Sequence, residues 1–188
     1  MSTTQPIRDV NHVRALINHY KNLGQHRNHL LIVFALHSAL RISDLLTIRW
    51  GNVYDFASKE PRTSLTLREQ KTGKIKTLAL NSKITKALAQ YAHNARAHEF
   101  LFANPNTSKA ITRTQARRII RDAGEAVNLP WGISCHSLRK TFGYHAWKSG
   151  VSPAVIMEIY NHSNLTTTRR YLGITQDDLD IVYIELGF

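Results

Sequence analysis

Two stretches in the C-terminal half of the chain combine histidine, arginine and tyrosine, side chains that handle protons and oxyanions. His136 and Arg139 are three residues apart, so on a helix they share one face. Arginine offers a planar, two-pronged donor to an oxyanion, and histidine exchanges a proton near neutral pH. His162 and Tyr171 follow in the next stretch. Each pair alone is common on surface helices, but together they indicate a site that binds an anion and moves protons.

Further cationic residues stand earlier in the chain. Arg41 lies in Ala39-Leu-Arg-Ile-Ser-Asp-Leu-Leu46, directly after an apolar segment. A charge placed there costs free energy unless it is paired or used, and the structural alternative is an ion pair with Asp44. A turn at Lys71-Thr-Gly-Lys74 offers lysines, and Lys76 follows it. The sequence therefore supplies cations that could assist the same anion site.

A separate basic stripe is expected on the helix that begins after Thr112. Arg113, Arg117 and Arg121 recur every four residues and share one face, with Arg118 beside them. Such a stripe matches the electrostatic footprint of a nucleic-acid backbone. A solvated basic face is the alternative, and the net charge of +12 from 25 basic and 13 acidic residues favours a polyanionic partner.

Composition excludes several other classes of protein. The 188 residues are enough for one domain with a real core. The single cysteine, Cys135, can form neither an intramolecular disulfide nor a thiolate zinc site, which favours a reducing compartment. The first ten residues lack an apolar signal core, and the longest apolar run, 30–36, is far shorter than the ~20 residues of a membrane span. We therefore expect a soluble, cytoplasmic protein.

The pattern of apolar residues predicts an α+β fold that is mainly helical, with one small antiparallel sheet. Helical spacing covers 9–22, and the wholly apolar segment 28–40 is long enough for a core helix. Two β-rich runs, 63–68 and 75–80, flank the turn and predict a hairpin. Later helices are expected after Ser82, after Thr112 with a capping box to Gln115, and from Ser152-Pro153. No repeat or linker divides the chain.

In their order and spacing, these motifs resemble the catalytic domain of the tyrosine recombinases, the phage integrase family, over about Val10 to Gly173. The Arg41 segment resembles the one that carries the family's first arginine, with Asp44 at its usual acidic position. Glu69-Gln-Lys-Thr-Gly73 resembles the hairpin of its catalytic lysine and favours Lys71 over Lys74 and Lys76. The family's remaining catalytic positions match His136, Arg139, His162 and Tyr171. The joint set is specific, although each motif alone is weak.

The chain departs from the family pattern in two places. Asn161 replaces the glycine that usually precedes the later histidine. The separate N-terminal helical domain that clamps DNA in many members has no counterpart here. We therefore expect either an excised fragment or a short enzyme resembling the fimbrial-switch invertases, with weak binding to its site unless neighbours or accessory DNA-bending proteins assist.

The resemblance implies a site-specific DNA recombinase that cuts and rejoins strands through a 3′-phosphotyrosyl intermediate. Tyr171 would be the nucleophile, and Arg41 and Arg139 would hold the non-bridging oxygens. Lys71 would protonate the leaving 5′-oxygen, His136 would act as base or proton relay, and His162 would donate to the phosphate. No metal or cofactor is implied. Further contacts to double-stranded DNA are expected from Lys74, Arg113, Arg117, Arg118, Arg121 and Lys140. The implied assembly is a tetramer on DNA, weak or monomeric without it, at the nucleoid.

The C-terminal residues form a distinct segment. We expect a catalytic domain over 1–176 and an acidic amphipathic tail over 177–188. The tail holds four acids and no lysine or arginine, together with the apolar residues Leu179, Ile181, Val182, Ile184, Leu186 and Phe188. Docking on the same chain and docking on a neighbouring protomer both remain open.

Three other classes of protein compete with this interpretation. A type IB topoisomerase shares the chemistry, but the short chain and the integrase-like motifs disfavour it. A non-catalytic DNA-binding protein of the same fold would be expected to have lost catalytic residues, and none is lost. A metal hydrolase is suggested by ten histidines, but the sequence lacks an H-E-x-x-H motif and any Cys/His cluster.

Overall fold

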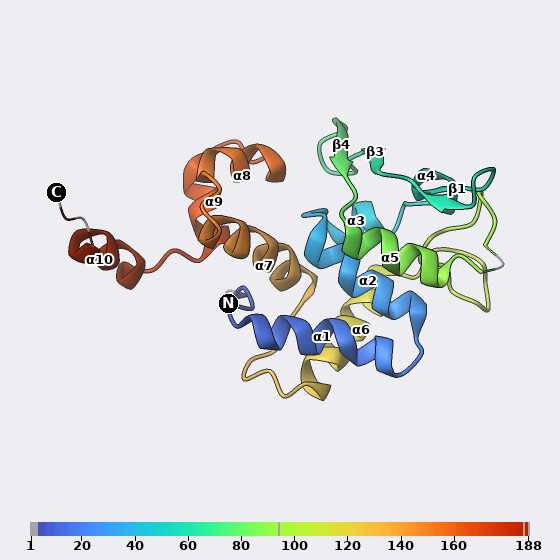
Figure 1. Ribbon diagram of the computed structural model, residues 1–188, viewed down its shortest axis with the longest axis horizontal. Helices are drawn as coiled ribbons and strands as arrows, with labels where there is room; N and C mark the ends of the chain where they lie inside the picture. The colour runs from blue at the N-terminus through green and yellow to red at the C-terminus, as the bar shows by residue number, and fades with distance from the viewer. Residues whose placement is uncertain (1–3, 94, 186, 188) are drawn as a thin grey trace.

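The computed structural model describes residues 4–93, 95–185 and 187, and within them it is mainly helical with two small antiparallel sheets (Figure 1). The helices are α1 Val10–Asn22, α2 His26–His37, α3 Ile42–Leu45, α4 Trp50–Val53, α5 Ser82–Tyr91, α6 Arg113–Ala126, α7 Cys135–Lys148, α8 Pro153–Tyr160, α9 Leu165–Leu172 and α10 Gln176–Glu185. The strands are β1 Tyr54–Asp55, β2 Glu60–Pro61, β3 Ser64–Arg68 and β4 Ile75–Ala79. None of these helices has the length and apolar character needed to cross a membrane.

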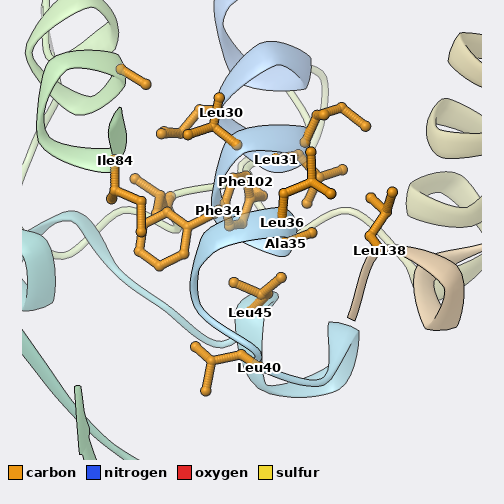
Figure 2. Packing of buried hydrophobic residues seen from close by; sticks show 14 of the residues in the cluster. Leu30, Leu31, Phe34, Ala35, Leu36, Leu40, Leu45, Ile84, Phe102 and Leu138 are labelled. Atoms are coloured by element: carbon orange, nitrogen blue, oxygen red, sulfur yellow. The ribbon is translucent and has the colours of Figure 1, made fainter. Parts of the chain in front are cut away.

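Helix α2 is the centre of the hydrophobic core, as its apolar sequence predicts. Every residue from 29 to 36 is buried, and α1, α5 and α7 pack around it. Leu30, Leu31 and Phe34 meet residues from distant segments, and the rings of Phe34 and Phe102 pack edge to face with centroids 6.3 Å apart (Figure 2). The helix ends at His37, earlier than the predicted residue 40, because Ala39 adopts a left-handed backbone with φ +55°.

The predicted lysine hairpin is present. Strands β3 and β4 pair antiparallel with Leu65 opposite Leu78 and Thr66 opposite Thr77. Gly73, at φ +68°, closes the turn by donating its N–H to the carbonyl of Glu69. The expectation of a single sheet was wrong, because β1 and β2 form a second hairpin. Strands of two residues are too short to produce a recognisable alternation of side chains.

Capping residues set the starts of the later helices. Thr112 and Gln115 form the predicted capping box of α6, and Ser152 caps α8 with Pro153 in its first turn. The prediction that Ser82 caps α5 was wrong, because Asn81 holds that position and accepts from the N–H groups of residues 83 and 84. Serine and asparagine are both good capping residues, and here the helix is capped by the asparagine that precedes the serine.

The C-terminal helices surround a second, smaller core. Helices α7, α8 and α9 pack over a cluster that contains Ala39, Ile156, Tyr160 and Leu172. Gly143 of α7 faces Tyr160 so closely that a Cβ there would overlap the phenol ring. The close approach of α7 to α8 therefore depends on glycine at this position.

Helix α10 extends away from the rest of the fold at one end of the molecule (Figure 1). Its first turn is held, because Lys148 Nζ lies 2.7 Å from a carboxylate oxygen of Asp178. The apolar residues beyond are exposed, with Tyr183 and Ile184 exposed by 83% and 82%. Leu186 and Phe188, part of the predicted apolar tail, lie outside the described residues.

Candidate active site

The fold brings His136 and Tyr171 together from α7 and α9. The Tyr171 hydroxyl is hydrogen-bonded to Nε2 of His136, and the two rings meet edge to face with centroids 5.3 Å apart. Burial and then the positive charges of Arg139, Lys140, Arg41 and Lys71 lower the pKa of His136. The imidazole is therefore neutral at pH 7, and its nitrogen can accept the phenolic proton.

Arg139 follows His136 by three residues on α7 and is buried. Its Nη1 donates to the carbonyl of Ala39 and its Nη2 donates to that of Tyr160 at 2.9 Å, while the guanidinium lies 4.6 Å from the centre of the Tyr160 ring. The Nε of Arg139 is buried without a partner among the described residues. Burial and then the charge of Arg41 lower the pKa of Arg139. The charges of the buried Arg139 and the partly exposed Arg41 therefore act on the same place and favour a bound anion there.

Arg41 stands at the N-terminus of α3 with its side chain 19% exposed. It pairs with Glu69 at 2.9 Å, so the predicted alternative of an ion pair with Asp44 was wrong. Asp44 is buried, and its Oδ1 accepts the backbone N–H of Gln70 at 2.9 Å. The carboxylate therefore holds the turn of the lysine hairpin.

The three hairpin lysines lie in different surroundings. Lys71 is exposed in the turn, and its charge contributes to lowering the pKa of both His136 and His162. Lys74 Nζ donates to the side chain of Asn161 at 3.4 Å. Lys76 is half-buried with its Nζ on the carbonyl of Ile159, and burial lowers its pKa. Lys71 is thus the one of the three whose ammonium group has no hydrogen-bond partner among the described residues. With Arg41 and Arg113, it lines a hollow beside the site.

His162 completes the cluster. Its Nδ1 lies 3.0 Å from the hydroxyl of Thr168, which is fully buried, and its ring centroid lies 4.6 Å from that of Tyr171. Burial and then the charge of Arg139 lower the pKa of His162 to about 4. The neutral ring, with Nδ1 on Thr168, leaves Nε2 available to meet a phosphate.

The depressed pKa of His162 predicts a pH-dependent stability. The pKa is 6.5 for an ordinary histidine and about 4 in the folded protein, so the folded state binds fewer protons between these values. The free energy of unfolding should therefore fall as the pH drops through this window and gain nothing further from His162 above it. Melting temperatures of the wild type and His162→Gln, measured from pH 8 to 4, check this prediction. The melting temperature of the variant should fall less steeply with decreasing pH than that of the wild type, and an equally steep fall would contradict the prediction.

The basic residues predicted to contact DNA divide into two groups. Arg113, Arg117, Arg118 and Arg121 are exposed on α6, although Arg121 is partly neutralised by Asp122 at 2.8 Å and Glu125 at 3.5 Å. Lys140 lies elsewhere than expected, because it is only 9% exposed and its Nζ donates to the carbonyl of Thr4 at 2.6 Å. The same ammonium lies 5.5 Å from the centre of the Tyr171 ring. Lys140 therefore packs beside Tyr171 instead of joining an exposed basic face.

Two contributors to the site could not be singled out from the sequence. Glu69 is visible there only as part of the hairpin motif, and Thr168 is one of three consecutive threonines. A single acid in a polar turn and a threonine among threonines carry no periodic signal, so only their packing reveals them. Within the described ranges, no group of three or more His, Cys, Asp or Glu residues is arranged to hold a metal ion.

Comparison with known proteins gives one family. Residues 9–177 match the Phage integrase family. The chain is 34% identical over 187 residues to "Probable integrase/recombinase YoeC" of Bacillus subtilis (strain 168), covering 100% of this chain and 99% of that protein. It is 26% identical over 171 residues to "Tyrosine recombinase XerC" of Anoxybacillus flavithermus (strain DSM 21510 / WK1), covering 86% of this chain and 54% of that protein. The chain thus spans nearly all of one relative and about half of the other.

Solved structures share the fold. A crystal structure of XerA recombinase superposes with a TM-score of 0.80 at 19% identity, covering 99% of this chain and 68% of that one. The XerH site-specific recombinase, bound to palindromic difH substrate in a post-cleavage complex, has a TM-score of 0.74 at 15% identity, covering 98% of this chain and 54% of that one.

Proposed function

Because this chain belongs to the phage integrase family of tyrosine-type site-specific recombinases, we propose that it cuts and rejoins DNA strands through a 3′-phosphotyrosyl intermediate formed on Tyr171. The observation that carries this proposal is the hydrogen bond between the Tyr171 hydroxyl and a neutral His136, whose pKa the charges of both Arg139 and Arg41 lower. The cluster therefore combines a nucleophile, a base that can accept its proton and cations that can bind the phosphate.

The proposed cleavage step uses the chain's own side chains. The Tyr171 oxygen attacks the scissile phosphorus while its proton passes to Nε2 of His136. Arg41 and Arg139 stabilise the charge that develops on the non-bridging oxygens, and Nε2–H of His162 donates to the same phosphate. The bond from phosphorus to the 5′-oxygen breaks, and Lys71 supplies the proton to that leaving oxygen.

Rejoining reverses these transfers. A 5′-hydroxyl attacks the phosphotyrosine, His136 returns the proton to Tyr171, and Lys71 recovers its proton from the attacking hydroxyl. The phosphotyrosyl bond conserves the energy of the phosphodiester, so the cycle as proposed needs no ATP and no other cofactor. Phosphate contacts around the site would come from the exposed residues Lys74, Arg113, Arg117 and Arg118, and more weakly from the partly neutralised Arg121.

Selection from random DNA tests this function without a defined target site. A pool of duplexes with a randomised segment carries a nick, so that cleavage releases a short 5′-hydroxyl fragment and traps the adduct. Protein denatured after incubation should retain DNA linked through its 3′ end, and the recovered sequences should converge on one site. Absence of any protein-linked DNA would contradict the proposal. Relaxation of supercoiled plasmids lacking that site would instead favour a topoisomerase.

We further propose that the chain acts as a tetramer on double-stranded DNA at the nucleoid, with 177–188 as the connecting tail. Exchange of strands between two DNA sites requires four cleavages and therefore four nucleophiles. The exposed apolar residues of α10 support docking on a neighbouring protomer, since apolar side chains gathered on a surface mark sites of interaction with other proteins. Accessory DNA-bending proteins would help this domain to hold its site.

Shortening the tail should separate assembly from folding. A chain ending at Asp178 keeps the contact with Lys148 but loses the exposed apolar residues. We expect it to bind single DNA sites but to lose the complex in which four protomers join two sites, with an unchanged melting temperature. Native gels and sedimentation check the number of bound protomers, and Asp180→Asn, which keeps the exposed apolar residues, is the control. Unchanged higher-order complexes would contradict docking on a neighbour.

A further inference from the structure

A buried carboxylate joins three parts of the site that the mechanism treats separately. The Glu69 side chain is fully buried at the end of β3. It accepts from Nη1 of Arg41 at 2.9 Å, from the Thr72 hydroxyl at 2.7 Å and from Nδ2 of Asn161 at 2.8 Å. One side chain therefore connects α3, the hairpin turn and the loop between α8 and α9.

The Asn161 side chain makes further contacts with the hairpin turn. Besides donating to Glu69, it lies 3.5 Å from the Thr72 hydroxyl and accepts from Lys74 Nζ at 3.4 Å. Asn161 ends α8 in the left-handed conformation, with φ +55° and ψ +44°, directly before His162. Asparagine tolerates this conformation better than most residues, and glycine tolerates it best. Glycine would keep the backbone here but lose every one of these contacts.

Hydrogen bonds hold this turn, and besides those to the Glu69 side chain they include the Gln70 N–H on Asp44 and the Gly73 N–H on the Glu69 carbonyl. Residues 70 to 75 are all exposed, so hydrophobic packing contributes almost nothing there. A segment of this kind opens at low free energy unless hydrogen bonds restrain it. Hydrogen bonds to an ionised carboxylate are stronger than those between neutral groups. Burial raises the pKa of Glu69, but hydrogen bonds from Asn161 and Thr72 and the charge of Arg41 outweigh burial, so the net pKa is lowered and the carboxylate is ionised.

We propose that Glu69 and Asn161, the Glu69–Asn161 clasp, are positioning residues that hold the Lys71 turn against the His162 loop. The clasp restrains the chain on both sides of Lys71, at Glu69 and at Thr72, so the ammonium stays within reach of the leaving 5′-oxygen. This inference rests on the proposed function and adds to it the contacts through which Lys71 is placed.

Three variants separate the effect of the clasp's side-chain contacts from the effect of the backbone conformation at residue 161. Asn161→Gly removes the side chain and keeps the left-handed turn. Asn161→Asp sets two carboxylates against each other. Adding Glu69→Gln to Asn161→Asp reverses the donor and the acceptor: the amide of residue 69 can still accept from Arg41 and now donates to residue 161, with the total charge of the pair unchanged.

The readout is cleavage of two nicked substrates that differ in the leaving atom. One carries the ordinary 5′-oxygen and the other a 5′-bridging sulfur, which leaves as a thiolate and needs no proton. Lys71→Ala removes the proton donor, so cleavage of the oxygen substrate should be slower by ~10²-fold or more, and cleavage of the sulfur substrate should be nearly unaffected. If the clasp acts through Lys71, Asn161→Gly should slow only the oxygen substrate, by about 10-fold. Asn161→Asp should be slower still, and the double variant should recover.

Each result supports or overturns the proposal. Equal slowing of both substrates by Asn161→Gly would overturn it, because it would place the defect in Arg41, DNA binding or folding. Failure of the double variant to recover, or loss of sulfur cleavage in Lys71→Ala, would overturn it as well. Adduct formation by the wild type in all these cases would leave the proposed function intact, whereas its absence on both substrates would show that the function itself fails.

Discussion

Tyr171→Phe should abolish the covalent protein–DNA adduct. The substitution removes one oxygen and keeps the ring that packs against His162 and Tyr160, so the fold and the phosphate site remain. Without the hydroxyl no group in the cluster can replace the attacking atom, and the rate should fall by ~10⁴-fold or more. Denaturing gels of a nicked substrate, labelled on the 5′ side of the scissile phosphate that stays joined to the protein, measure the adduct, and a gel shift measures binding.

Two observations complete this test. Binding of the selected duplex should be unchanged, because phosphate contacts and not the hydroxyl supply the affinity. Tyr144→Phe is the matched control, since this tyrosine of α7 lies against Arg8 and Trp147 and has no role in the proposed mechanism. An adduct that survives in Tyr171→Phe would show that another residue is the nucleophile.

Arg139→Gln should damage both catalysis and stability. Loss of a charged donor to the phosphate oxygens typically costs ~10²- to 10³-fold in rate. The shorter, neutral amide also cannot reach both carbonyls that Arg139 now serves, those of Ala39 and Tyr160. A buried carbonyl without a donor costs about 1–3 kcal/mol, so the melting temperature should fall too. Single-turnover cleavage and thermal denaturation measure the two effects.

The exposed Arg14 of α1 supplies the comparison for this substitution. Arg14→Gln removes the same charge from the surface and should leave the cleavage rate and the melting temperature near wild type. If Arg139→Gln proves as mild as Arg14→Gln, the buried guanidinium is not the phosphate ligand. Loss of stability without loss of rate would assign Arg139 a structural role alone.

Much of the fold follows from local patterns in the sequence. Helices α1 and α2, the lysine hairpin and the capping box of Thr112 are all visible, because apolar spacing and capping depend on residues within a few positions of one another. The errors were equally local: α5 is capped by Asn81 in place of Ser82, and the second hairpin has strands too short for a pattern. Helix α2 ends early because Ala39 turns to meet Arg139.

Residue types and their spacing along the chain indicate the class of chemistry and the residues that are candidates for it. The packing of the folded chain establishes which of these groups meet. It placed His136 on Tyr171, paired Arg41 with Glu69 instead of Asp44, buried Lys140 beside the tyrosine and joined the hairpin to Asn161. These partners lie up to 92 residues apart, and they meet because the burial of α2 and the packing of α7, α8 and α9 bring their segments together. No local pattern encodes such contacts, so the energetics of the site arise from packing.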